Sequence, residues 1–455
     1  MPVIELRRSE PDVRQIIGGF FFPNTIGASL FRMVAAAWLI RMTVVAFVFR
    51  GLPDPARGFE QFGWEMGWVA RSIATGHGFA SPFLPMTGPT ALVPPGFPYL
   101  LAGIFRVFGV YSPGSGLAVL SLDALFSALT CIPVYLIARD AVGDRTARIA
   151  GWAWVVYPFS IYYSTVVWEW ALTALLFTTC LWLLLQLHTV EQTWKWAGFG
   201  LLYGATALVN PSVLSVLPFL LAITLWRRHR VGQTWFVKAA VTALTVIAVL
   251  VPWTVRTYRT MHVLVPVRDN YWLEFYAGNT GDGFESNAAW AHPASNPAEM
   301  TLFEQQGETA YLAGKHRLAL EFVANHPGWF AMATVRRVVR YWTGFWSFNA
   351  RYLHKEPFDV PNLFFCSAIT VLMLRGAARL WRVDRESAMP LLTLIAVFPV
   401  TYYLSHASMD YRQPIEPVIV ILAVTGVFGF GGRRPDEPQG RRRSASREVA
   451  YELAG

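Results

Sequence analysis

The chain contains few cysteines and few charged residues. Its 455 residues include three cysteines, Cys131, Cys180 and Cys366, each within an apolar run. Three scattered thiols cannot build a disulfide framework, so we expect inert packing residues. Charged residues make up 15% of the chain and hydrophobic residues 54%. This balance excludes a disordered or collagen-like chain and argues against a set of soluble domains.

Several common motifs are also missing. The sequence has no Asp-x-Asp pair to grip a nucleotide sugar through a metal ion, and no His-Glu-x-x-His zinc motif. The net charge of +9 comes with Arg clusters beside apolar segments. No basic-aromatic RNA-binding signature accompanies them, so we expect no nucleic-acid partner. The N-terminus lacks a short apolar core followed by a small-residue cleavage site, so we expect no removable signal peptide.

Long apolar runs dominate the sequence. A helix that crosses a bilayer needs about 20 mostly apolar residues. Trp, Tyr and Phe, which number 19, 17 and 32, favour the two membrane interfaces. We therefore predict an all-α polytopic membrane protein with about ten transmembrane helices. The predicted spans are 30–49, 114–138, 148–166, 170–187, 196–209, 211–226, 238–255, 361–378, 388–405 and 413–431.

Two apolar segments do not have the length of one span. Residues 196–226 are too long, and Asn210-Pro211 in the middle predicts a break, because proline lacks a backbone donor and disfavours helix at the preceding residue. Residues 96–110 are too short, since about 15 residues at ~1.5 Å each cannot cross a ~30 Å core. We expect two short helices in the first segment and an interfacial or re-entrant helix in the second.

The positions of Lys and Arg predict the orientation. With the N-terminus in the cytoplasm, nearly all Lys and Arg of the short loops lie on the cytoplasmic side, and the short outward turns hold only Arg412. We predict a multi-pass protein of the inner (cytoplasmic) membrane with both termini in the cytoplasm. Its predicted parts are a cytoplasmic segment 1–29, a membrane domain 30–431 and a basic, disordered tail 432–455.

Two long polar segments, about 50–112 and about 256–360, are predicted to lie on the extracytoplasmic face. The first contains a Pro-rich stretch that must be extended or turning. The second contains an amphipathic helix around 299–324 and an Arg-aromatic stretch, 335–346, suited to the lipid headgroup layer. We expect the functional residues to lie in these segments and in the short outward turns.

Three acidic residues are predicted to converge at the outer face: Glu65, Glu169 and Asp410. Such a convergence is what an active site at a membrane surface requires. Each carboxylate alone could simply be solvated. Glu169 could instead cap the positive end of the helix that follows it, or bind a divalent cation such as Mg²⁺ or Mn²⁺.

The ordered motifs of the chain resemble a known family. In sequence order they are GWEMGWVARSIATGHGFASPF, TGPTALVPPGFPYLLAGIFRVFGVY, ALVNPSVLSVLP, VPWTVRTYR with YWLEFYAGNT, and MDYRQPIEPVIVILA. This set, over about residues 30–430, resembles the GT-C glycosyltransferases, specifically the bacterial glycosyltransferase family 39 group. That group is related to protein O-mannosyltransferases and to the aminoarabinose transferase of lipid A. The resemblance implies a GT-C-like helical bundle with two large extracytoplasmic loops.

The resemblance also implies an activity. A hexose or pentose would pass from a polyprenyl-phosphate donor to a lipid, glycan or protein acceptor at the outer face. The family usually carries an Asp, often Asp-Glu, in its first loop as the proposed base. Glu65 stands at the matching place here, with Asp54 and Glu60 as nearby substitutes. A positioned carboxylate can accept the proton of an attacking acceptor hydroxyl.

The leaving lipid phosphate gains negative charge and needs cations. Arg256, Arg259 and Arg412 are the predicted phosphate ligands, because a guanidinium binds phosphate through two donors. Each could instead reach toward lipid headgroups. Relatives tend to carry Lys or Arg where Asn210 stands. The predicted substrate site is completed by Glu169, Asn210, Asp410 and Tyr411, and no metal or other cofactor is required by the motifs.

Two charges fall inside predicted spans. Arg41 and Asp123 lie roughly 12–14 Å below the outer face at ~1.5 Å per residue, where a charge costs at least ~2.5 kcal/mol. We predict that they form an ion pair. A buried charge and a broken helix are also features of transporters. A transporter or flippase of lipid-linked sugars is therefore the alternative function, and a non-catalytic assembly subunit is a third.

Overall fold

The fold is that of a computed structural model. The structure describes residues 21, 23, 25–49, 62–84, 86–280, 290–344 and 359–430. Regular structure in these residues is helical, apart from an isolated antiparallel bridge between Ala80 and Pro89. The predictions for Asp54, for Glu60, for most of the N-terminal segment and for the C-terminal tail lie outside the described residues.

Seven apolar helical segments within the described residues are long enough to cross a membrane. The helices that form them are α2 (Ile26–Phe49), α6 (Pro113–Leu129) with α7 (Cys131–Val142), α10 (Trp170–Leu187), α13 (Phe236–Met261), α19 (Asp359–Val383), α20 (Arg385–Val397) with α21 (Val400–Leu404), and η5 (Asp410–Ile415) with α22 (Glu416–Phe428). The chain is thus an all-α, multi-pass membrane protein, as predicted.

The other three predicted spans are shorter helices. They are α8 (Asp144–Val155), α11 (Thr193–Val209) and α12 (Leu217–Arg230). Proline causes two of the interruptions: Pro158 begins α9 (Pro158–Tyr162), and Pro211 begins η3 (Pro211–Ser215) after extended backbone at Asn210. The predicted break at Asn210-Pro211 is therefore confirmed. The segment around 96–110 is α5 (Gly96–Phe108), a helix of 13 residues that is too short to cross alone.

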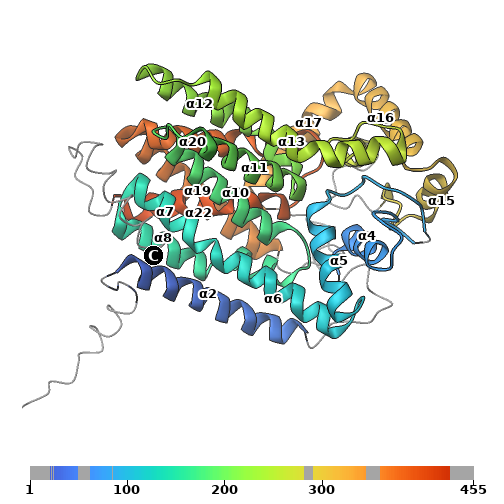
Figure 1. Cartoon of the computed structure of the whole chain (residues 1–455), viewed down its shortest axis with the longest axis horizontal. Coiled ribbons are helices and arrows are strands. Elements are labelled where there is room, and N and C mark those ends of the chain that lie inside the picture. Colours follow the sequence, from blue (N-terminus) through green and yellow to red (C-terminus); the bar gives the residue numbers. More distant parts are fainter. Residues whose placement is uncertain are drawn as a thin grey trace, which may run out of the picture.

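The long helices lie side by side, and the smaller helices gather at one end of the bundle (Figure 1). These smaller helices are α4 (Trp64–Ala74), α5, α14 (Tyr271–Asn279), α15 (Pro297–Gln306), α16 (Glu308–Asn325) and α17 (Pro327–Thr343). We call this the loop end, and the other end the opposite end. Both long polar segments of the sequence therefore contribute to the same end. The predicted amphipathic helix around 299–324 is two helices, because Gly307 with φ 73° separates α15 from α16.

The final span packs backbone to backbone against α19. A Cβ at Gly376 would lie 1.8 Å from the Leu422 carbonyl oxygen, and one at Gly426 would lie 2.1 Å from the Leu372 carbonyl oxygen. Small residues permit this approach inside a membrane, where van der Waals packing stabilises helix pairs. The contact holds α22 in the protein interior, and η5 directly precedes it.

The predicted ion pair between Arg41 and Asp123 is wrong. Arg41 is fully buried and donates to the Oγ atoms of Ser127 at 2.8 Å and Ser160 at 2.7 Å, and to two carbonyl oxygens at the end of α8. Asp123 is also fully buried, and neither carboxylate oxygen has a hydrogen-bond partner in the part of the chain that is described. The end of α8 leaves carbonyl oxygens without helical donors, and a guanidinium with five donors satisfies them.

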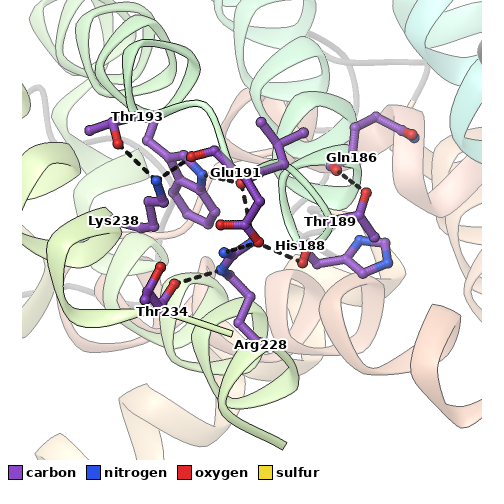
Figure 2. A network of polar contacts seen from close by, with 10 residues as sticks. Gln186, His188, Thr189, Glu191, Thr193, Arg228, Thr234 and Lys238 are labelled. Carbon is purple, nitrogen blue, oxygen red and sulfur yellow. Dashed lines mark hydrogen bonds and ion pairs between the residues drawn. The ribbon is translucent and has the colours of Figure 1, made fainter. Parts of the chain in front are cut away.

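Charged side chains also fasten the opposite end of the bundle. Buried Arg228 on α12 pairs with Glu191 at 2.8 Å and donates to the His188 carbonyl oxygen at 3.2 Å. Lys238 on α13 donates to Thr193 Oγ1 at 2.8 Å and to the Glu191 carbonyl oxygen. Figure 2 shows how these contacts join the loop between α10 and α11 to α12 and α13.

Candidate active site

Glu65 lies in the first turn of α4, beside the turn that precedes α10. Gly63 has φ 92°, and a Cβ there would lie 2.9 Å from the Val167 carbonyl oxygen. Glycine is required where backbone segments meet this closely at positive φ. The rings of Trp64 and Trp168 also meet, with centroids 5.7 Å apart. The first loop and the turn that carries Glu169 are therefore packed together.

The Glu65 carboxyl group is largely buried and has an imidazole neighbour. Its side chain is 13% exposed, and Oε1 lies 3.5 Å from Nε2 of His292. Burial raises the pKa of Glu65. His292 and Arg268 lower this pKa in part, and the charge of Glu274 raises it. A carboxyl group with a raised pKa is a better proton acceptor than an ordinary one once it is ionised.

Glu274 on α14 is a second carboxylate in this site, and it was missed from the sequence. Its Oε2 lies 3.5 Å from Nδ1 of His406. Burial alone would raise the pKa of Glu274, but the hydrogen bond and charge of His406, with Arg268 and His292, hold it at about 2. Neighbouring carboxyl groups whose pKa values are pushed apart are a mark of acid-base sites. The motif YWLEFYAGNT contains Glu274 and offered the only signal for it.

Arg268 is the cation of this group, and it too was missed. It is half-buried in the segment between α13 and α14, and its Nε is buried without a hydrogen-bond partner. It forms no ion pair with any carboxylate among the described residues. Its charge lowers the pKa of Glu65, Glu169 and Glu274. A guanidinium with free donors can take an oxyanion such as a phosphate.

Glu169 and Asn210 lie together in this cluster. Asn210 Nδ2 donates to Glu169 Oε1 at 3.4 Å, and Oε2 of Glu169 is buried without a partner. Burial raises the pKa of Glu169 to about 8, with Arg268 lowering it and Asp410 raising it. The side chain makes no capping hydrogen bond to α10. Glu169 therefore does not cap α10 through a hydrogen bond, and the interaction of its charge with the positive end of the helix stays a prediction.

The segment η5 completes the cluster with Asp410 and Tyr411. The Tyr411 ring stacks on Tyr402 with centroids 4.5 Å apart, and its hydroxyl lies 3.4 Å from Nδ1 of His406. Tyr402 in turn donates to Ser212 Oγ at 2.8 Å. The charge of Arg268 acts on Glu65, Glu169 and Tyr411, while Asn210 contacts Glu169 and the charge of Asp410 acts on Glu169. Five of the predicted site residues, Glu65, Glu169, Asn210, Asp410 and Tyr411, are thus linked to Arg268 directly or through Glu169.

The three arginines predicted to bind phosphate have other surroundings. Arg412 is buried and pairs with Glu416 at 2.7 Å. Arg256 donates to the Thr90 carbonyl oxygen at 2.6 Å and so holds the first loop. Arg259 is exposed on α13. That these arginines bind the donor phosphate stays a prediction. The contacts of Arg412 and Arg256 with other groups of the protein do not favour it. Sequence alone showed that each stands near the end of a span, but not which way its side chain turns.

Glu308 on α16 fastens the Pro-rich part of the first loop near this site. Its Oε2 accepts from Thr90 Oγ1 at 2.5 Å, and its Oε1 accepts from the Ala91 backbone N–H at 2.6 Å. Arg256 donates to the carbonyl oxygen of the same threonine. The two polar segments of the chain are therefore joined by buried hydrogen bonds.

We expect Glu308→Ala to lower the free energy of unfolding by about 2–4 kcal/mol, because two buried donors lose their acceptor and each costs about 1–3 kcal/mol. Glu308→Gln should cost less, since its amide oxygen can still accept from Ala91. Thermal unfolding of the purified protein in detergent measures both. A melting temperature of Glu308→Ala equal to that of the wild type would contradict the role.

The metal prediction is left open by this geometry. The unpartnered Oε2 of Glu169 is a hard oxygen of the kind that Mg²⁺ and Mn²⁺ prefer. Over the described ranges, however, no three His, Cys, Asp or Glu side chains are arranged to hold an ion. The role of Glu169 as a metal ligand stays a prediction.

Comparison with known proteins bears on the family and the fold. Residues 92–253 match the family model for dolichyl-phosphate-mannose-protein mannosyltransferase. This range includes Glu169 and Asn210 but neither Glu65 nor Arg268. No curated protein matches the chain.

Solved structures resemble this one over most of its length. The archaeal oligosaccharyltransferase AglB from Archaeoglobus fulgidus, in complex with an inhibitory peptide and a dolichol-phosphate, matches with TM-score 0.53 and 15% identity, covering 92% of this chain and 54% of AglB. The apo oligosaccharyltransferase from this organism matches with TM-score 0.52 and 16% identity, with the same coverage of 92% and 54%. The chain spans about half the length of these archaeal structures.

A more distant likeness is to ArnT from Cupriavidus metallidurans bound to undecaprenyl phosphate. It has TM-score 0.37 and 13% identity, and covers 89% of this chain and 78% of ArnT. The AglB match and the family model agree with the resemblance found in the sequence motifs. The chain has the GT-C fold of membrane glycosyltransferases, and its residues 92–253 match the dolichyl-phosphate-mannose-protein mannosyltransferase family model.

Proposed function

We propose that this chain is an integral membrane glycosyltransferase that moves a sugar from a polyprenyl-phosphate donor to an acceptor at the extracytoplasmic face. One observation carries the proposal. Arg268, which forms no ion pair within the described residues, lowers the pKa of two buried carboxyl groups at the loop end: Glu65, which lies 3.5 Å from His292, and Glu274, which lies 3.5 Å from His406. A base and a phosphate ligand in one site are what such a transfer needs.

Each residue of the cluster has its own role in this reaction. The acceptor hydroxyl attacks the anomeric carbon and gives its proton to the Glu65 carboxylate. The bond from that carbon to the phosphate oxygen breaks, and the leaving polyprenyl phosphate keeps the electron pair. Arg268 stabilises the charge that develops on this phosphate. His292 positions Glu65, and Glu169, Asn210, Asp410 and Tyr411 line the space for the substrates.

Observations that do not involve the residues of this cluster support the donor class and the orientation of the protein in the membrane. The matching AglB structure holds a dolichol-phosphate, and the matching family is described by a dolichyl-phosphate sugar. The excess of Lys and Arg in the loops of the opposite end favours a cytoplasmic location for that end and an outward location for the loop end. The partners are a lipid-phosphate donor, a lipid, glycan or protein acceptor, and membrane lipids.

The purified protein in detergent should release sugar from one member of a panel of polyprenyl-phosphate and nucleotide sugars. Arg268→Gln should lower kcat/KM for that donor by roughly 10–100-fold, since hydrogen bonds to charged groups are worth about 1.5–3 kcal/mol. Arg268→Lys should keep part of the activity. Arg317→Gln, an exposed change on α16, is the matched control. Turnover of a nucleotide sugar alone would contradict the proposed donor.

One observation favours the alternative of a transporter or flippase. Asp123 is a buried, unpartnered carboxyl group within a span, and ionisable groups at such depth often mark translocation pathways. Transport of a lipid-linked sugar across vesicles by a protein that turns over no donor would select this alternative. Asp123→Asn should then abolish transport, whereas in the glycosyltransferase it should leave transfer intact.

A further inference from the structure

A groove runs beside α4 at the loop end. Two cavities of about 270 and 350 Å³ share the side chains of Trp68, Phe83 and Leu84 in their walls. Because they share three residues, they adjoin one another. Together they reach the size at which proteins bind small organic ligands, about 300–1,000 Å³.

The groove lies along the helix that carries Glu65. Glu65, Trp68 and Ser72 have the i, i+3, i+7 spacing that places side chains on one face of a helix. The second cavity is lined by Pro293, directly after His292, whose Nε2 lies 3.5 Å from Glu65. At ~1.5 Å per residue, Ser72 lies roughly 10 Å along the helix from Glu65. A molecule in the groove would extend from the candidate base toward Ser72.

The far part of the groove lacks an anion. Arg71 lies 5.0 Å from the Trp68 ring centroid, and no ion pair is recorded for its guanidinium within the residues that the structure describes. Ser72 is 5% exposed, and its hydroxyl is buried without a hydrogen-bond partner. His77 lines the same cavity, and no Asp or Glu is among the described residues of its wall. An unsatisfied hydroxyl beside a guanidinium that forms no ion pair is a favourable place for an oxyanion.

We propose that this groove binds the acceptor and that the acceptor carries an anionic group, a phosphate or a carboxylate, held by Arg71 and Ser72. The proposal rests on the proposed function, because it takes Glu65 as the base. The anion lies roughly 10 Å from the hydroxyl that Glu65 deprotonates. Trp68 and Phe83 give aromatic faces to the uncharged part of the acceptor. The anionic group could belong to a lipid headgroup or to a water-soluble glycan.

Calorimetric titration of the full chain in neutral detergent tests the anion site. The soluble probes are glucose 6-phosphate, glucuronate and uncharged glucose, and the lipid probe is short-chain phosphatidylglycerol below its micelle concentration. We expect anionic probes to bind and glucose not to bind. Binding of the soluble anions identifies a water-soluble acceptor, and binding of the phosphatidylglycerol alone identifies a lipid acceptor.

Three variants locate the binding. Arg71→Gln should weaken anion binding by roughly 10-fold or more, because it removes the charge-assisted hydrogen bonds. Ser72→Ala, a smaller change, should weaken it a few-fold, and Arg317→Gln should leave it unchanged. Wild-type affinity in Arg71→Gln, or no binding of any anionic probe to the wild type, would overturn the proposal.

Turnover separates this proposal from the proposed function. In Arg71→Gln the KM for the donor should be unchanged, while the KM for an anionic acceptor should rise. Equal transfer to anionic and uncharged acceptors would overturn the proposed anion site but would still support the proposed glycosyltransferase function. Anion binding through Arg71 with no turnover of any donor would instead reject the glycosyltransferase.

Discussion

Glu65→Gln should reduce sugar transfer by about 10²-fold or more, because the amide keeps the size and polarity of the side chain but cannot accept a proton, and a positioned general base contributes about 10²–10⁴-fold. The carboxyl group is 13% exposed, next to His292 and under the influence of Arg268. The variant should fold like the wild type. The measurement is donor turnover and transfer by purified protein, beside thermal unfolding.

The pH profile gives this prediction a second readout. A base must be ionised to act, and burial raises the pKa of Glu65. Transfer should therefore fall as pH decreases through a value above about 4.3, the ordinary value for Glu, and this acid limb should vanish in Glu65→Gln. Glu304→Gln, an exposed change on α15, is the control. Wild-type activity in Glu65→Gln would reject the assignment of the base.

Arg412→Met should destabilise the folded protein by about 3–5 kcal/mol, the range found when a buried ion pair loses one partner. Arg412 and Glu416 are 2% and 1% exposed and lie 2.7 Å apart. Tyr157 donates to the same carboxylate at 2.7 Å. Removing Arg412 leaves the Glu416 charge without its cation in the interior. The loss should appear as a lower melting temperature and poor recovery in detergent.

The double variant Arg412→Met, Glu416→Met is the matched control, because replacing both members of a buried pair by apolar groups is often neutral or stabilising. It should recover most of the lost stability and keep the KM for the donor. A stable Arg412→Met protein with a raised donor KM would instead restore the phosphate role that the sequence suggested.

The sequence predicted the helical architecture because apolar runs of sufficient length determine membrane-spanning helices. The break at Asn210-Pro211 followed from proline alone. The Arg41 partners could not be predicted in this way. They include carbonyl oxygens freed where α8 ends, a feature of three-dimensional packing that no charge pairing in the sequence reveals.

The candidate site was predicted in part. Both Glu169 and Asp410 stand in short turns that are predicted to lie on one face of the membrane, so the sequence predicted their convergence with Glu65 from the order of spans. Arg268 and Glu274 lie in the long second loop, where no span fixes the position of a side chain. The direction of a side chain was equally unpredictable in the stretch 335–346, which the sequence assigned to the lipid headgroup layer. Arg337 in this stretch turns inward and donates to the Gly278 and Tyr403 carbonyl oxygens, at 2.7 Å each.

Arg228 and Lys238 fasten α12 and α13 to the loop that precedes α11 at the opposite end (Figure 2). Because both helices are joined to the same loop by buried side chains, the loss of either Arg228 or Lys238 would free one helix from this loop while the other stays attached.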